Sequence, residues 1–499
     1  MKTALKSTTL AVLLLASGLT LADPKSDPAA FSAALFPAPK AEFALPGFAS
    51  NSFTHYDQIQ AYLETIVRTS EAKLYSLLKT DQGREVWALK LPNPKAKLRV
   101  MVYARVHGNE PGASEGALQL LDALTRGELK RQYADLELLV VPMANPDGSV
   151  ANRRDTAKGG DINRDFVKYD YAETRAIQAE IQRFDPHVVV DAHEFTVWGR
   201  LGPMSSASDL QSAGPNEPNL PPELIAVHEQ LFRSAITANF AQAGLRHDLY
   251  ELLSIDKQSG RLQVGESATT FVSAKNYHAM SGRISLLFES RGIGLNDQHR
   301  VRRTLSHYLA MKAVLQSAQG NADMLVKLLN DSRKKIAGRS TWEIDRKPIR
   351  EERQFLLADS TSNSIVKVPA DFIKRTEGKA THTVQVPRYY LVPQTHKSFI
   401  DVLSRMGVKV DTLRQPLRVE VGVQTANLSS KGEAISVDST TDKARRGFEA
   451  GDYVITTQQR AGLYLQTLEG TSPNGFARAG LFGKQGTVEL PFYRYDGAL

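Results

Sequence analysis

The sequence predicts an α/β domain, residues 51–334, followed by a smaller β-rich domain, residues 335–499. Strand-like and helical segments alternate along the first of these regions, which favours a sheet covered by helices on both faces. After about residue 335 most segments are strand-like and are separated by turn residues. With 499 residues, 42% of them hydrophobic, the chain is long enough to bury a core in two domains.

Periodicity supports each element of the α/β domain in turn. Continuous apolar runs predict strands, and apolar residues three and four apart predict helices. A helix is expected after Pro111, because proline suits the first helical turn. The other expected elements are the helical segment within 55–67, strands at 84–91, 97–106 and 137–141, a helix at 171–184, strands at 187–192 and 282–289, and a helix carrying Val301, Leu305, Tyr308 and Leu309 on one face.

In the second domain, "LRVEVGVQ", "GDYVITTQQ" and "GTVELPFYRYDG" read as strands between turns. The segment "SFIDVLSRM" predicts one short helix that Gly407 ends. Nothing in these segments indicates a site, so we expect this domain to have a structural role or to shape the rim of a cleft.

The N-terminus predicts export. Lys2 and Lys6 precede an apolar run and small residues ending "TLA", which is the pattern of a signal peptide, residues 1–22. Residues 23–50 are rich in alanine and proline and predict an extended lead-in. No other apolar run is long enough to span a bilayer, so we expect no membrane insertion after signal cleavage.

The chain contains no cysteine, which excludes disulfides, thiolate metal ligands, a cysteine nucleophile and lipid attachment at a lipoprotein cysteine. An export signal without cysteines favours a bacterial periplasmic or secreted protein. The formal net charge of +8 is a mild basic excess that favours acidic polymers or membrane surfaces without identifying one. We expect no nucleic-acid partner, and the oligomeric state is left open.

Ionisable residues gather where the expected strands end. His107 and Glu110 follow one buried strand, and His193 follows another. Two imidazoles and a carboxylate form a three-ligand set for one catalytic Zn²⁺, with the fourth tetrahedral position open. A single His and Glu three apart is usually a surface or capping coincidence. Here several buried strands end in ionisable residues, which requires compensating partners.

Glu289 ends a third strand, "RISLLFE". One interpretation is an acid at the start of a loop, paired with Arg291. The interpretation that we favour is a general base, because hydrolysis by a zinc-activated water needs a carboxylate that takes the proton and returns it to the leaving amine.

The segment "NPDGSVANRRDTAKGGDINRDF", residues 145–166, could be a solvent-exposed loop. Its order of NPDG, an arginine and DxNR, combined with HxxE and a later histidine and glutamate, resembles the zinc metallocarboxypeptidases of the carboxypeptidase A type. The resemblance covers about residues 52–330. It implies a mixed, largely parallel twisted sheet with helices on both faces.

The resemblance also implies a role for each motif residue. It assigns zinc binding to His107, Glu110 and His193, and the general base to Glu289. It assigns the grip on the free carboxylate of the substrate to the motif DxNR, as Asn163 and Arg164. Arginine suits that task because its planar fork meets a carboxylate with two parallel hydrogen bonds.

Two further motif residues act beside the metal in the family. The arginine that polarises the scissile carbonyl best matches Arg154, with Arg153 as the alternative. Asp161 would orient a zinc-ligand histidine. The family's mobile tyrosine has no counterpart at the usual spacing, and Tyr277 is the nearest candidate. For a charge at the base of the specificity pocket, Lys275 and Arg283 are candidates.

The function that these residues predict is a zinc metallocarboxypeptidase that hydrolyses the C-terminal peptide bond of peptides. The leading alternative is a cell-wall peptidase that cuts γ-glutamyl-diaminopimelate bonds. The form HGNE also resembles the zinc amidohydrolases that remove acyl groups from small amino acids, the succinylglutamate desuccinylase and aspartoacylase branch. A non-catalytic peptide-binding module is the remaining hypothesis.

Overall fold

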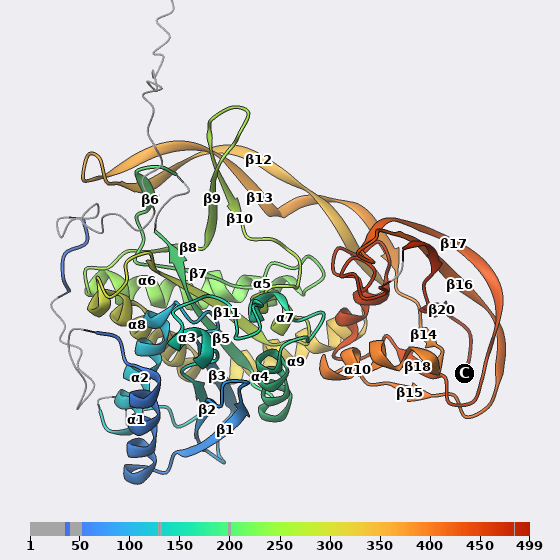
Figure 1. Cartoon of the computed structure of the whole chain (residues 1–499), viewed down its shortest axis with the longest axis horizontal. Helices are drawn as coiled ribbons and strands as arrows, with labels where there is room; N and C mark the ends of the chain where they lie inside the picture. Colours follow the sequence, from blue (N-terminus) through green and yellow to red (C-terminus); the bar gives the residue numbers. More distant parts are fainter. Residues whose placement is uncertain (1–34, 40–51, 128, 130–131, 198–200, 484) are drawn as a thin grey trace, which may run out of the picture.

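The computed structural model describes residues 35–39, 52–127, 129, 132–197, 201–483 and 485–499 (Figure 1). The expected signal peptide and most of the expected lead-in lie outside the described residues. Within the described part of the chain, none of the helices combines the length and apolar character needed to cross a membrane.

An eight-stranded mixed sheet forms the centre of the α/β domain, in the order β1-β2-β4-β3-β5-β11-β7-β8. The central strands β4, β3, β5 and β11 run parallel to one another, and antiparallel pairs flank them. The predicted fold class is therefore confirmed. The strands are β1 (Lys73–Lys79), β2 (Glu85–Leu91), β3 (Leu98–Ala104), β4 (Leu136–Val141), β5 (Val188–Thr196), β7 (Leu210–Ala213), β8 (His247–Leu249) and β11 (Ile284–Ile293).

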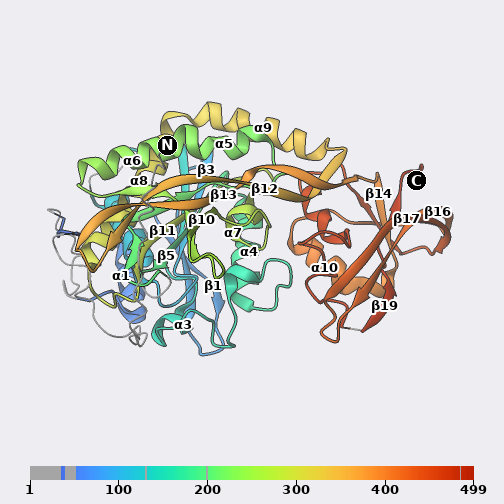
Figure 2. The ribbon, with the colours of Figure 1, turned by 90° about the horizontal axis from the view of Figure 1, so that it is seen from above.

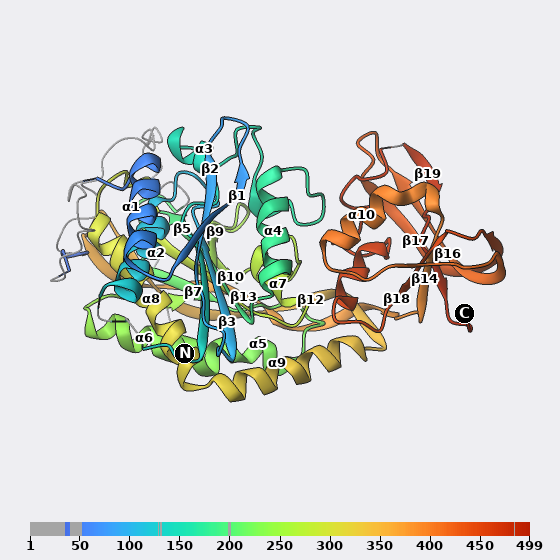
Figure 3. The same cartoon turned by 90° about the horizontal axis from the view of Figure 1, so that it is seen from below.

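Helices cover both faces of this sheet (Figure 3). On one side lie α1 (Tyr56–Thr69), α2 (Pro111–Thr125) and α8 (Arg300–Gly320), and on the other lie α4 (Ala172–Phe184) and α7 (Ala274–Ala279). Burial on both faces explains why the central strands are almost continuously apolar. The remaining helices are α3 (Pro146–Val150), α5 (Pro222–Val227), α6 (Arg233–Gln242), α9 (Ala322–Ala337) and α10 (Lys397–Arg405).

The strand ends differ from the sequence expectation in a way that matters for the site. β3 stops at Ala104, and Arg105 turns the chain with a left-handed backbone (φ 56°), so His107 lies in the following loop. β5 and β11 instead run on past their apolar segments to Thr196 and Ile293. His193 and Glu289 are therefore inside strands, where the pleat fixes the direction of their side chains.

A second sheet, which the sequence did not predict, lies above the domain in the order β6-β12-β13-β10-β9. Its two long strands form a hairpin that passes from the α/β domain towards the C-terminal domain (Figures 1 and 2). The strands are β6 (Met204–Ser206), β9 (Glu251–Ile255), β10 (Leu262–Glu266), β12 (Thr341–Asp359) and β13 (Ser364–Gln385).

The remaining strands form a third sheet in the order β15-β18-β14-β20-β16-β17, with β19 paired to β16. The short predicted helix is present as α10, and Gly407 follows it with a left-handed backbone (φ 89°). Buried residues of this part, including Phe399 and Tyr464, belong to the same hydrophobic core as the α/β domain. The strands are β14 (Tyr389–Val392), β15 (Asp411–Thr412), β16 (Leu417–Leu428), β17 (Ala434–Phe448), β18 (Tyr453–Thr456), β19 (Gly486–Glu489) and β20 (Tyr493–Tyr495).

Candidate metal centre and substrate cleft

Two loops lock together to present His107. The Asn145 amide donates to the backbone carbonyls of Val106 and Arg154, both at 3.2 Å, and its Oδ1 accepts from the Gly148 amide at 2.9 Å. A Cβ on Gly108 would come within 2.0 Å of the Gly148 backbone, so only glycine fits there. The start of the NPDG segment is thus buried against the HGNE loop and is not a solvent-exposed loop.

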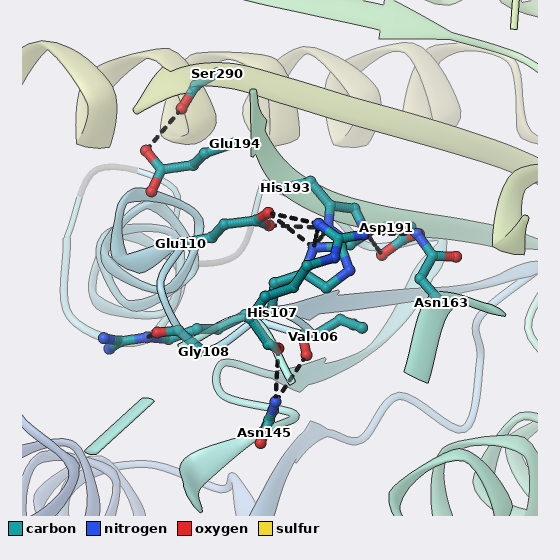
Figure 4. A network of polar contacts seen from close by, with 12 residues as sticks. Val106, His107, Gly108, Glu110, Asn145, Asn163, Asp191, His193, Glu194 and Ser290 are labelled. Carbon is teal, nitrogen blue, oxygen red and sulfur yellow. Dashed lines mark hydrogen bonds and ion pairs between the residues drawn. The ribbon is translucent and has the colours of Figure 1, made fainter. Parts of the chain in front are cut away.

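His107, Glu110 and His193 converge into one cluster (Figure 4). Glu110 precedes the first turn of α2, and its carboxylate lies between the two imidazoles, with Oε1 2.7 Å from His107 Nδ1 and Oε2 2.9 Å from His193 Nδ1. The two Nδ1 atoms are 3.1 Å apart. All three residues are at most 3% exposed.

A carboxylate holds the outer nitrogen of each histidine. Asp161 Oδ1 lies 3.1 Å from His107 Nε2, and Asp191 Oδ1 lies 2.8 Å from His193 Nε2. A hydrogen bond from His107 Nε2–H to Asp161 fixes the tautomer of that ring, and the buried negative charge of Asp191 favours a proton on Nε2 of His193. Both Nδ1 atoms face the interior of the cluster. Asp191 was missed in the sequence analysis. The signal was available, because residues two apart in a strand point to the same face.

The acids also set the charge of the cluster. Burial by itself would lower the pKa of both histidines. The nearby acids outweigh it: Glu110 and Asp161 raise the pKa of His107 above its ordinary value, and Asp191 and Glu110 raise that of His193. Burial raises the pKa of Glu110, yet the two imidazoles hold it well below its ordinary value. Three buried or half-buried carboxylates surround the two imidazoles, so a bound cation would be stabilised at this site.

The donor set fits a divalent metal ion. One ligand atom from each of His107, Glu110 and His193 lies within 4.8 Å of the others. Two imidazole nitrogens and one carboxylate oxygen form a set that suits zinc and leaves a position open for a substrate or water. These three residues could therefore hold one metal ion.

Glu289 lies beside this cluster on β11. It is in direct register with His193 on the parallel strand β5, so the two side chains leave the sheet on the same face. Burial raises the pKa of Glu289 to about 7, with His193 opposing and Glu110 adding to the shift. A carboxyl with a pKa near neutrality can exchange a proton under ordinary conditions.

The predicted substrate residues line one cleft, which has a volume of about 650 Å³ and is also lined by His107, Glu110 and Glu289. Arg154 donates from Nη2 to Asp161 at 2.7 Å and reaches His107 Nδ1 with Nη1 at 3.1 Å. Arg153 instead donates to the Thr156 carbonyl, so Arg154 is the arginine beside the metal cluster. Arg164 is exposed in this cleft, and Asn163 Nδ2 lies 3.2 Å from His193 Nε2.

Tyr277 does not reach the cleft. It is completely buried, stacked on Phe166 with ring centroids 4.7 Å apart, and its hydroxyl contacts Tyr169. We therefore do not retain it as a substrate-covering tyrosine. Tyr250, which precedes β9 and was not singled out in the sequence, does line the cleft.

Of the two cationic candidates for the specificity pocket, only Lys275 lines the cleft. Arg283 is buried behind it and donates to Asp185 at 3.0 Å. Glu194, next to His193, turns away from the cluster (Figure 4). It makes a two-point ion pair with Arg303, at 2.7 and 2.8 Å, and fixes α8 against the sheet.

Comparison with known proteins places these residues in context. The family model described as zinc carboxypeptidase matches residues 59–235, a range that includes the metal cluster and ends before Glu289. Carboxypeptidase 2 of Trichophyton tonsurans is 28% identical over 488 residues, covering 91% of this chain and 90% of the relative. A protein named Probable carboxypeptidase 2, from Arthroderma benhamiae, is 30% identical over 461 residues, covering 86% and 87%.

Among solved structures, carboxypeptidase A from Helicoverpa armigera aligns with 57% of this chain and 78% of its own, at 17% identity and a TM-score of 0.43. The two relatives above are fungal, so the expectation of a bacterial source stays a prediction.

Proposed function

We propose that the chain, which belongs to the zinc carboxypeptidase family, removes C-terminal residues from peptides. In this proposal it uses one zinc ion, and Glu289 is the general base. As a family member the chain is a metallopeptidase, and the proposal concerns how its residues act. The observation that supports it most is that one cleft is lined by two residues of the metal cluster, His107 and Glu110, by the buried carboxyl of Glu289 and by the exposed guanidinium of Arg164.

The metal ligands in this proposal are His107, Glu110 and His193. A zinc ion held there would polarise the scissile carbonyl and lower the pKa of a water molecule. Asp161 and Asp191 keep each imidazole in the tautomer that binds metal. Because Asp161 also binds Arg154, the position of that guanidinium is tied to the position of His107.

Substrate selection follows from Asn163 and Arg164. The guanidinium of Arg164 is exposed in the cleft and can meet the terminal carboxylate with two parallel hydrogen bonds. The Asn163 side chain is fixed on both sides, since its Oδ1 accepts from the Ala274 amide at 3.1 Å and its Nδ2 faces His193. Internal peptide bonds offer no such carboxylate, so the enzyme would act on chain ends.

Arg154 and Glu289 carry the proposed chemistry. Arg154 lies next to His107 and is positioned to donate to the carbonyl oxygen as negative charge develops on it, a contribution of about 10²–10³ in rate for a donor of this kind. Glu289 takes a proton from the attacking water and returns it to the leaving amine. Its raised pKa suits both halves of that transfer.

The decisive experiment is digestion of a peptide library by the purified chain, with and without a chelator, read by mass spectrometry. We expect chelator-sensitive loss of single C-terminal residues. Release of diaminopimelate fragments from muropeptides, with ordinary peptides untouched, would favour the cell-wall alternative. Hydrolysis of N-acyl amino acids alone would favour the amidohydrolase branch, and no cleavage by a zinc-loaded sample would favour a binding module.

We also propose that the chain is exported, on the strength of the pattern in residues 1–22. The mature protein would begin at Asp23. N-terminal sequencing of the secreted or periplasmic fraction tests this, and a chain recovered from the cytoplasm with Met1 intact would contradict it.

A further inference from the structure

A buried lysine lies in the wall of the cleft without an acidic partner. Lys275 is 2% exposed, and its amine donates to the side-chain oxygens of Asn216 and, at 3.3 Å, Asn276. Both acceptors are neutral amides. Within the described part of the chain, no carboxylate forms an ion pair with this amine.

Glu266 is the acid whose charge acts on Lys275 without contacting it, and its carboxylate is hydrogen-bonded to other residues. Glu266 accepts from the Arg375 amide at 2.6 Å, the Thr376 amide at 2.7 Å and the Thr376 hydroxyl at 2.9 Å. Burial lowers the pKa of Lys275 to about 7, and Glu266 only partly offsets that shift. Burial among neutral amides therefore disfavours the charged form of this amine, and a carboxylate brought close to it would favour that form.

Lys275 is also joined to the proposed carboxylate grip. The residue before it, Ala274, donates its backbone amide to Asn163 Oδ1 at 3.1 Å. Both Asn163 and Lys275 line the same cavity of about 650 Å³. The lining of this cavity mixes polar and apolar residues, among them Ser267, Thr270, Ala268 and Val272 from the segment that precedes α7.

A peptide held by its terminal carboxylate at Asn163 and Arg164 therefore has its last side chain close to α7. We infer that Lys275 selects peptides whose C-terminal residue carries a side-chain carboxylate, glutamate or aspartate. An incoming carboxylate supplies the counter-charge that the buried ammonium lacks. A neutral side chain supplies no such counter-charge, and a basic side chain opposes protonation of the amine.

This inference rests on the proposed function and names its substrate class. The test compares kcat/KM of the zinc-loaded full chain for N-blocked dipeptides that end in Glu, Gln, Leu or Lys and are otherwise identical. We expect the Glu substrate to exceed its isostere Gln by about tenfold or more, as for a site with an unpaired buried donor. In Lys275→Met the ratio should fall to near one, while the Leu substrate is still cleaved.

The matched control is Lys257→Met, the same substitution at an exposed lysine in the β9–β10 turn, which should keep the wild-type ratio. Equal rates for Glu and Gln in the wild type would overturn the inference, and that ratio decides alone if Lys275→Met fails to fold. A preference for Lys would also overturn it and would direct attention to Glu251, another cleft residue. Failure of the proposed function is distinct, because then none of the four dipeptides is cleaved.

Discussion

Replacing Asp191 by asparagine tests how far the metal cluster depends on a residue that binds no metal itself. The carboxylate of Asp191 is fully buried and lies 2.8 Å from His193 Nε2. Asparagine has nearly the same shape, and its side-chain oxygen can occupy the same place beside Nε2. The substitution therefore removes the negative charge and leaves the geometry largely intact.

The structure indicates how large the effect should be. Losing the acid partner of a metal-bound histidine costs roughly 10 to 100-fold in metal affinity, or about 1.4–2.7 kcal/mol. Asp191 has no exposed surface, so solvent does not screen its charge, and we expect the upper half of that range. The Asp161 side chain is 19% exposed and shares its charge with Arg154. Asp161→Asn should therefore lose less zinc affinity than Asp191→Asn.

The assay is competition for zinc against a chromophoric chelator, with thermal unfolding of the same samples. Asp209→Asn is the matched control, because Asp209 is equally buried but pairs with Arg302 away from the cluster. The control should lose stability and keep its zinc affinity. Zinc affinity of Asp191→Asn within about twofold of wild type would refute the reasoning, because that residual change is far below the expected loss.

Three further outcomes follow from the site and the fold. Glu289→Gln should retain zinc, measured by elemental analysis, and lose about 10²–10⁴-fold in kcat; near-normal turnover would remove Glu289 from the role of base. Arg164→Ala should lower kcat/KM for peptides with a free C-terminus by an amount equal to roughly 1.5–3 kcal/mol. Equal cleavage of C-terminally amidated and free peptides by the wild type would contradict this role of Arg164. Burial alone would raise the pKa of Asp185, but Arg460 and Arg283 lower it, so its contribution to stability is present at neutral pH and is lost as the pH falls below about 4. Asp185→Asn should therefore lower the unfolding temperature at pH 7 more than at about pH 2.5, where the unfolded-state carboxyl is protonated, and an equal loss at both would contradict the ion-pair explanation.

Sequence reasoning identified the metal cluster because its logic is local. His107 and Glu110 lie three residues apart, and strands that run parallel deliver His193 and Glu289 to the same edge of the sheet. The alternation of side chains along β5 that sets the direction of His193 also puts Asp191 on the same face of the sheet. A single acid within an otherwise apolar run gives no motif by which the sequence could identify it.

The long hairpin could not be read in the same way. β12 has buried residues only near its two ends, and the middle of the strand carries charged residues that remain exposed. A ribbon with no continuous buried face has no hydrophobic pattern to distinguish it from a loop. The strands that pair with it, β6 and β10, are 3 and 5 residues long, and the pairing joins residues more than 100 positions apart. That pairing depends on tertiary contacts that a single sequence does not display.

Tyr277 shows how a wrong assignment can still point to a relevant element. The tyrosine is not a lid, but its helix, α7, forms part of the cleft wall through Ala274 and Lys275. Behind that wall, the Tyr464 ring of the C-terminal domain packs on Tyr277 with centroids 4.9 Å apart, and its hydroxyl donates to the Tyr277 carbonyl at 2.7 Å.

The C-terminal domain therefore supports the cleft from the side that substrate never reaches. A six-residue helix has too few internal hydrogen bonds to hold its own position, so its placement depends on what packs against it. On one side α7 is bonded to Asn163, and on the other it is fixed by Tyr464. Because a selective contact at Lys275 needs the lysine to hold its position, the C-terminal domain contributes to specificity by keeping this helix in place.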